Sequence, residues 1–306
     1  MNTDGDLKVL PRAVWLRMRD EHRDIVQPWV QPRLDRRSRS AKHPIDDFLF
    51  EYYPISANKL LTWHPGFGYL CESTMQDLEF FPEQVYGRSG ENIQILESWS
   101  THQINEARST IDFLNQTMSR TMRTGCFGLH EWAMVLGQDI TRHSDWKLRL
   151  TQTDIQQTIE DVGLRCTHFD AFRFFTPQAR PLNPVQLSRA DQIDFDQSGC
   201  LHANMDLYKY AIRFAPIVGS TLVRSCFALA KEIRTVDMQV APYDFSELGV
   251  EPIKVETPEG RALFAAYQRD FAERANVLRK HLIACLQEFI SITSPSDKPN
   301  SQVRNR

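Results

Sequence analysis

The amino-acid sequence predicts a mainly α protein: a single globular helical domain over residues 1–292, with room for a small β element, followed by a flexible tail over residues 293–306. Apolar residues recur at helical spacing along most of the chain, whereas the strict alternation that marks half-buried strands is scarce. At 306 residues the chain can bury about three quarters of its unfolded surface, so it needs neither disulfides nor metals to fold.

In the first part of the chain, Pro11–Val30 suits a helix, because a proline in the first turn loses no hydrogen bond there. Two further helices are expected over Pro44–Tyr53 and Ser56–Trp63. Phe67–Glu79 is the best candidate for a strand or an ordered loop. Glu91–Met122 is expected to form one long helix or two shorter ones.

In the second part, Cys126–Leu136 and Gly199–Arg234 are again helical in pattern, and Pro258–Ser291 is the clearest helix of the chain. Its expected apolar stripe recurs at steps of three, four and seven residues and consists of Leu263, Tyr267, Phe271, Leu278, Leu282, Leu286 and Phe289.

Composition points to a cytoplasmic protein. No apolar run approaches the ~18–20 residues that cross a bilayer, and the polar stretch Met1–Asp6 lacks the core of a signal peptide. The six cysteines are scattered without a CxxC spacing, which favours reduced thiols over a structural zinc site. We therefore expect no membrane partner and find no sign of an obligate protein partner.

The net charge of −3 gives no global signal for nucleic acid, but residues 31–43 carry five basic residues against one acidic residue. Such a strip can bind a phosphate backbone even on an acidic protein. A solvated connector explains the same strip equally well.

Three segments (124–139, 164–183 and 199–213) bring a histidine close to a carboxylate in apolar surroundings. The first contains His130 and Glu131, which need partners if they are buried. Neighbouring helical positions point ~100° apart, so we do not expect both side chains in one pocket. The alternative is that the pair caps or cross-links helices inside the core.

The second segment interleaves phenylalanines with His168, Asp170 and Arg173. On a helix, Asp170 and Arg173 would pair at i,i+3, whereas on a strand His168 and Asp170 would share a face. The functional interpretation is a carboxylate held between aromatic walls, and the alternative is a structural ion pair. The proline-rich loop that follows, residues 177–184, is of a kind that often frames a site.

The third segment places His202, Asp206, Lys209 and Arg213 on one continuous helical face. A polar face on an otherwise apolar helix requires partners or a ligand, or else it meets solvent. His202 and Asp206 could begin a metal site, but no complete metal-binding spacing is present. We therefore assign no metal ligand and expect no cofactor.

One partial motif, residues 135–139, is like the water-activating loop of uracil-DNA glycosylases, where an apolar strand runs into Gly-Gln-Asp. The Pro-Tyr-His of that family does not follow here, and a partner leucine loop with its His-Pro-Ser pattern is absent from the sequence. Asp139 is kept as a minor candidate.

The chain also resembles, from about Pro11 to His281, a bacterial family generally labelled 3-methyladenine DNA glycosylase. The likeness rests on Lys42-His43-Pro44, Asp47-Phe48-Leu49-Phe50, Trp63-His64-Pro65-Gly66, Gly125–Met134, Cys166–Leu182, Cys200–Lys209, Cys226-Phe227-Ala228-Leu229-Ala230 and Pro242-Tyr243-Asp244. The helix-hairpin-helix of better-known helical alkyladenine glycosylases is not visible. The resemblance implies a reaction class, excision of a damaged or modified base from DNA, but carries no catalytic residue over.

A glycosylase stacks a flipped base on aromatic side chains, holds the flanking phosphates and stabilises an oxocarbenium-like state with a carboxylate. For the carboxylate we expect Asp170 first, then Asp206, then Glu131, with His168 or His202 as the proton donor that a neutral base requires. The expected base-binding residues are Trp132, Phe172, Phe174, Tyr208 and Asn183. The expected phosphate contacts are Arg33, Arg36, Arg37, Arg39, Arg173, Lys209 and Arg213.

Two other classes of protein fit the same residues. A hydrolytic or metal-dependent small-molecule enzyme would use the same histidines and carboxylates. A non-catalytic helical binding module would use them as structural pairs. Whether a glycosylase would repair host DNA or restrict modified phage DNA stays open at this point, as do the base that is excised and the oligomeric state.

Overall fold

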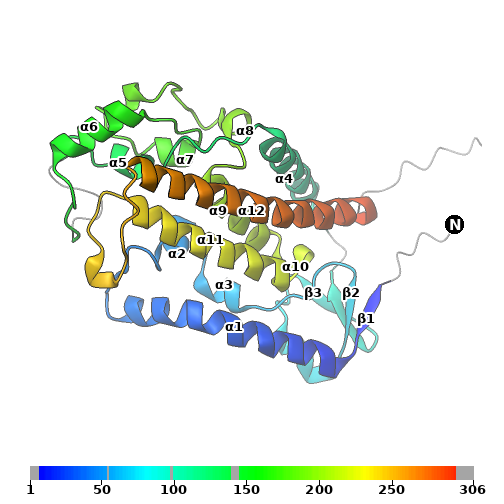
Figure 1. Cartoon of the computed structure of the whole chain (residues 1–306). Coiled ribbons are helices and arrows are strands. Elements are labelled where there is room, and N and C mark those ends of the chain that lie inside the picture. The colour runs from blue at the N-terminus through cyan, green and yellow to red at the C-terminus, as the bar shows by residue number, and fades with distance from the viewer. Residues whose placement is uncertain (1–6, 54, 97–98, 139–144, 294–306) are drawn as a thin grey trace, which may run out of the picture.

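A computed structural model describes residues 7–53, 55–96, 99–138 and 145–293, and it confirms the predicted mainly α class. Three long helices form the centre: α9 (Leu201–Arg213), α11 (Ser220–Val240) and α12 (Pro258–Thr293), each of which packs against the other two. Helix α4 (Thr101–Ser119) packs on α12, and the short α10 (Ala215–Val218) links α9 to α11. Figure 1 shows α11 and α12 running side by side through the molecule.

The N-terminal helices cover α11. Helix α1 (Arg12–Ser38) packs along α3 (Ala57–Leu61) and contacts α11, and α2 (Phe48–Tyr52) lies against α11 as well (Figure 1). The C-terminal end of α1 carries the first part of the basic segment 31–43. This arrangement brings the basic segment and α2 to the same end of α11 as the short helices described next (Figure 1).

Short helices in the middle of the chain gather at one end of the central helices (Figure 1). They are α5 (His130–Ala133), α6 (Gln152–Val162), α7 (Phe169–Phe172), α8 (Gln192–Phe195) and the 3-10 turns η2 (Arg180–Leu182) and η3 (Ser246–Leu248). Helix α6 begins at a capping box, in which Thr151 and Asp154 satisfy each other's backbone N–H groups.

A four-stranded sheet of order β1-β2-β4-β3 packs beside the start of α1. Its strands, with the 3-10 helix η1 between the second and third, are β1 (Lys8–Leu10), β2 (Tyr69–Glu72), η1 (Met75–Phe80), β3 (Tyr86–Ser89) and β4 (Asn92–Ile95). Strands β1 and β2 are parallel, and the other two pairs are antiparallel. Trp15 from α1 joins Trp63, Phe81 and Tyr86 in a small hydrophobic cluster under this sheet.

The sheet corrects one prediction. The stretch Glu91–Met122 was expected to be helical from its start, but its first residues form β4, and the helix begins only at Thr101. The alternation of Asn92, Ile93, Gln94 and Ile95 is the physical reason, because it places both isoleucines on the buried face of the sheet.

Two expected helices are much shorter in the structure. Cys126–Leu136 contracts to α5 because Phe127 and Gly128 both adopt positive φ angles, of 44° and 69°, which no α-helix accommodates. Pro44–Tyr53 contracts to α2.

In α12, by contrast, the expected bounds hold but part of the predicted stripe does not. Leu263 and Tyr267 are 50% and 37% exposed, whereas Phe264 and Gln268, one position further along, are buried. The buried face of the helix therefore passes through Phe264 and Gln268 at this point. Periodicity alone placed it one residue too early, at Leu263 and Tyr267. None of the helices in the described ranges has a stretch both long and apolar enough to span a membrane.

Candidate functional site

A cleft of about 350 Å³ opens where α2, α5, α7, α9 and α11 meet. Side chains from separate parts of the sequence line it: Lys42, His43, Pro44, Phe48, Glu51, Tyr52, Glu131, Met134, Asp145, Trp146, Asp170, Ala171, Phe174, His202 and Arg234. We call it the central cleft. Its volume lies in the range of pockets that enclose a small molecule or a nucleobase.

Helix α2 supplies an aromatic wall of the central cleft. The rings of Phe48 and Tyr52, one turn apart, stack with centroids 4.9 Å apart. The hydroxyl of Tyr52 is buried, and within the described residues no group hydrogen-bonds to it. Burial raises the pKa of Tyr52 well above its usual value, and the negative charges of Asp206 and Asp170 raise it further. The hydroxyl is therefore a neutral donor that has no partner among the described residues.

Asp170, in α7, also lines the central cleft and is only 8% exposed. Its Oδ1 atom accepts a bond of 2.9 Å from Arg189 and lies 3.1 Å from the guanidinium of Arg173, the pairing expected for a helix. Arg173 also covers the ring of Phe174, with 4.4 Å between the guanidinium carbon and the ring centroid. A carboxylate and an aromatic ring thus line the cleft together, and the same carboxylate forms the ion pair of the structural interpretation, so the geometry fits both interpretations of this segment.

Glu131 and Arg234 form the floor. The Nη1 atom of Arg234 lies 3.1 Å from Glu131 and 2.8 Å from Oδ2 of Asp237, and the Arg234 guanidinium also lies over the ring of Phe48 at 3.8 Å. All three charged side chains are buried, and one arginine therefore balances two carboxylates from α5 and α11. Removing such a partner from a buried network costs about 3–5 kcal/mol.

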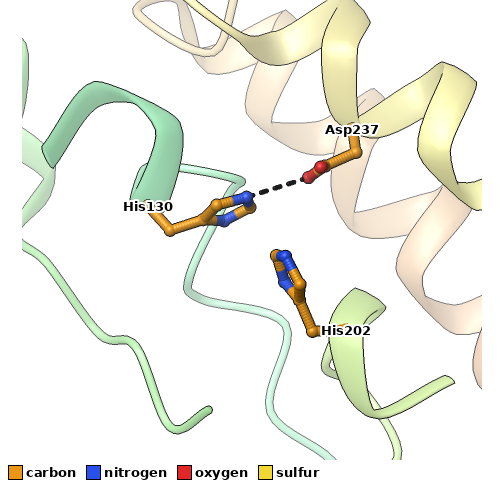
Figure 2. Close-up of side chains that lie close together, drawn as sticks. All are labelled: His130, His202 and Asp237. Atoms are coloured by element: carbon orange, nitrogen blue, oxygen red, sulfur yellow. Dashed lines mark ion pairs between the residues drawn. The ribbon is translucent and has the colours of Figure 1, made fainter. Parts of the chain in front are cut away.

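Beside this floor, His130, His202 and Asp237 converge from α5, α9 and α11, with one ligand-type atom of each within 4.8 Å of the others. Figure 2 shows the three side chains pointing toward one another. His130 Nε2 lies 3.1 Å from Asp237 Oδ1, and the ring centroids of His130 and His202 are 4.5 Å apart, nearly perpendicular. We call these three residues the His–His–Asp cluster.

A third buried histidine, His168, packs against this cluster. His168 stacks on His202 with ring centroids 5.3 Å apart, and its Nδ1 atom lies 2.9 Å from Oδ1 of Asp196. Both His168 and Asp196 are completely buried. The contact with Asp196 fixes the orientation of the His168 ring, and His168 in turn supports the His202 ring.

The electrostatics of the cluster differ from residue to residue. Burial disfavours protonation of His130, but the attraction of Asp237 outweighs it and raises the pKa of His130. Burial and the neighbouring His130 hold the pKa of His202 well below its usual range. For Asp237, burial favours the neutral acid, yet the His130 and Arg234 charges lower its pKa. His202 is therefore the neutral imidazole and Asp237 the ionised carboxylate, the forms in which these groups bind metals, whereas Asp237 favours the protonated form of His130.

The backbone before α5 sets the position of this cluster. A β-carbon on Gly128 would lie 2.3 Å from a Val240 methyl group, so the chain passes α11 closely enough to bring His130 to Asp237. As expected, His130 and Glu131 point into different cavities: Glu131 lines the central cleft, whereas His130 lines a small adjoining void of about 20 Å³.

Asp206, the second candidate carboxylate, is held by other residues. Tyr53 donates to its Oδ1 atom at 2.7 Å and Lys209 to its Oδ2 atom at 2.6 Å, and only 1% of Asp206 is exposed. Burial opposes the charge, but Lys209 lowers the pKa of Asp206. Asp206 and Lys209 therefore form a buried ion pair under the cleft.

Of the expected base-binding residues, only Phe174 lines the central cleft. Trp132, Phe172 and Tyr208 lie in the hydrophobic core, where Trp132 also donates to the carbonyl of Val240 at 2.7 Å. Asn183 is buried and bonds the backbone of Cys166 and Val185, which fixes the proline-rich loop.

Of the residues expected to contact phosphates, some are held in ion pairs within the protein and others are exposed. Arg33 and Arg36 lie 3.0 and 2.5 Å from the buried Asp47. Arg213 pairs with Glu106, while Arg37 and Arg39 are exposed. The same basic segment ends in Lys42 and His43, which line the central cleft.

Sequence reasoning singled out His130 without giving it a role in the site, and it did not propose Asp237, Arg234 or Tyr52. The sequence did contain a signal for Asp237 and Arg234. Asp237 lies at helical spacing from the apolar residues Ala230, Ile233 and Val240 of α11, and Arg234 lies three residues before Asp237. Charged residues on such a stripe must have buried partners. The minor candidate Asp139 lies outside the described residues.

Comparison of the chain with protein-family models, with curated proteins and with solved structures yields no match. The family resemblance drawn from the sequence motifs therefore stays a prediction, and the function must be argued from the site itself.

Proposed function

We propose that this chain is a cytoplasmic DNA glycosylase, which hydrolyses the N-glycosidic bond of a damaged or modified base flipped out of DNA and leaves an abasic site. One observation carries the proposal: the carboxylate of Asp170 and the aromatic rings of Phe48, Tyr52 and Phe174 line one cleft of about 350 Å³. These are the two components that the reaction requires, a stacking surface for the base and a negative charge beside the sugar.

In the proposed reaction, the bond between the base nitrogen and C1′ breaks, and the electron pair leaves with the base. The carboxylate of Asp170 stabilises the positive charge that develops on the sugar and accepts a proton from the attacking water. The water oxygen bonds to C1′. A cationic alkylated base leaves without protonation, whereas a neutral modified base is assisted by hydrogen bonds, for which the free hydroxyl of Tyr52 is positioned.

The surface around the cleft supports DNA as the substrate. Lys42 and His43 line the cleft, and they continue the exposed basic residues Arg37 and Arg39 at the end of α1. A strip of positive charge that leads into a cleft would hold the phosphates on either side of a flipped nucleotide. Arg33 and Arg36, which are tied to Asp47, would support this strip from behind.

The test is abasic-site formation by the purified protein on three duplexes: alkylated DNA, plain DNA, and DNA carrying hydroxymethylated or glucosylated cytosine. We expect cleavage after abasic-site treatment on one modified duplex, and its loss in Asp170→Asn. The control variant, Asp112→Asn, changes an exposed carboxylate on α4 and should remain fully active. Absence of abasic sites on every duplex would overturn the proposal.

The second candidate is a small-molecule enzyme, and the His–His–Asp cluster beside the cleft is the observation that favours it. This alternative predicts no affinity for DNA, whereas a glycosylase binds DNA with an affinity that falls as salt rises. Measuring DNA binding between about 50 and 200 mM salt, the usual range of that effect, therefore separates the two.

A further inference from the structure

We propose that the His–His–Asp cluster binds one divalent transition-metal ion through His130, His202 and Asp237. Three different helices supply these side chains, and one nitrogen or oxygen of each lies within 4.8 Å of the other two. Two imidazoles and one carboxylate form a ligand set that zinc and ferrous iron share. The proposal is independent of the glycosylase activity, because metal binding is measured without DNA.

The contact between His130 and Asp237 is the strongest argument. His130 Nε2 and Asp237 Oδ1 form a buried ion pair at 3.1 Å, and among the described residues neither atom has a hydrogen bond to any other group. Two atoms bound to one tetrahedral zinc ion stand about 3.3 Å apart, so the observed separation suits two ligands that share an ion.

His202 provides the third ligand and the second, independent observation. It is only 6% exposed, and its contacts in the described part of the chain are with rings: edge-on to His130, stacked on His168 and tilted to Tyr52. Within those residues neither of its nitrogens has a hydrogen bond. This imidazole lacks a polar partner and points toward the buried His130–Asp237 pair, whose facing atoms have no hydrogen bond to any other described group. An ion between the three side chains explains this arrangement.

Outer contacts hold the ligands in place. Arg234 donates to Oδ2 of Asp237 at 2.8 Å and leaves Oδ1 turned toward His130. His168 holds the ring of His202 by stacking, and Asp196 holds His168. Supporting contacts of this kind orient the ligands of most metal sites. Since His202 also lines the central cleft, a bound ion would lie beside the cleft, where water can complete its coordination.

The experiment is titration of the chelator-treated full chain with Zn²⁺ and, under anaerobic conditions, with Fe²⁺. We expect one equivalent of one of these ions per chain and a rise in the melting temperature on binding. Magnesium, which prefers oxygen ligands, should neither bind nor compete. Co²⁺ bound in place of Zn²⁺ or Fe²⁺ should give the visible absorption bands of a cobalt ion with a low coordination number.

His202→Phe is the test variant, because phenylalanine preserves the stacking on His168 while removing the ligand. We expect binding of the metal to weaken at least about 100-fold. The matched control is His64→Phe: His64 is 7% exposed and stacks, with centroids 5.8 Å apart, on Tyr86, which belongs to the hydrophobic cluster under the sheet. Metal binding should be unchanged in this control.

A second variant, Asp237→Asn, tests the carboxylate, with circular dichroism to establish that the chain is folded. The inference is overturned if the wild-type chain binds no more Zn²⁺ or Fe²⁺ than His202→Phe does. It is equally overturned if folded His202→Phe and Asp237→Asn both retain wild-type affinity, since the ion then binds elsewhere.

Discussion

His168 and Asp196 form a completely buried pair, with 2.9 Å between Nδ1 of the imidazole and Oδ1 of the carboxylate. The pair joins the start of α7 to the end of α8 and supports the ring of His202 from behind. Neither side chain contacts solvent, and Asp196 is the hydrogen-bond partner of the His168 ring, while its other oxygen accepts a bond of 3.2 Å from Gln192. The pair therefore stabilises the packing of α7 and α8 and holds His202, a residue of the cleft lining, in position.

Asp196→Asn should lower the free energy of unfolding by about 3 kcal/mol, because it leaves the buried imidazole without its charged partner. Urea denaturation measures this as a lower midpoint with an unchanged slope. The matched control is Asp194→Asn, which changes an exposed carboxylate in the same short helix. Equal stability of the two variants would show that the buried pair contributes nothing.

Asp47 should make stability depend on pH at the acid end. Burial favours its neutral form, but hydrogen bonds from Arg36 and from the backbone of His43, together with the charge of Arg33, lower its pKa. A carboxylate with a lowered folded pKa stabilises the protein above its unfolded value of about 3.9, and this contribution is lost as the pH falls through the folded pKa.

We therefore expect the melting temperature to decline below pH ~4, and Asp47→Asn to flatten that decline while lowering the stability at neutral pH. Melting curves of both proteins between neutral pH and the acid limit of the fold measure it. A decline of the same steepness in Asp47→Asn would assign the acid sensitivity to other carboxylates.

Tyr52→Phe should reduce activity without reducing stability. The hydroxyl is buried, and no described residue hydrogen-bonds to it, so its removal breaks no bond within the described protein. We expect the melting temperature to stay level or rise slightly, and turnover on the cognate DNA to fall about 10- to 100-fold if the hydroxyl contacts the base. A fall in stability with unchanged turnover would instead assign a structural role to this hydroxyl.

The basic segment should determine how strongly DNA binding depends on salt. The triple variant Arg37→Ala, Arg39→Ala, Lys42→Ala removes three charges from the approach to the cleft. The slope of log affinity against log salt should become shallower by about 1 for each phosphate that the variant no longer neutralises. Arg33 and Arg36 are left unchanged because they hold Asp47.

The control for this experiment is the double variant Arg269→Ala, Lys280→Ala, which removes exposed charges from α12. Its salt slope should equal that of the wild-type chain. If both variants shift the slope alike, DNA contacts the protein nonspecifically over its whole surface.

Some features of the site could be predicted from the sequence, because they depend on spacing within one helix. The i,i+3 spacing of Asp170 and Arg173 predicts an ion pair when the segment is helical, and the structure contains it. The 100° turn between His130 and Glu131 separates them into different cavities. What spacing did not show is that Trp132 and Tyr208 are covered on all sides by the core, because burial depends on which helices pack around them.

By itself, the sequence determined the helical class, the long C-terminal helix and the three segments that supply His130, Glu131, Asp170 and His202 to the site. Only the tertiary structure decided that Asp170 faces a cleft while Asp206 is held by Tyr53 and Lys209, and that His130, His202 and Asp237 meet at one point. The physical reason is range: helical periodicity depends on neighbours three or four positions away, whereas Asp237 reaches His130 across more than one hundred positions, a distance only packing can close.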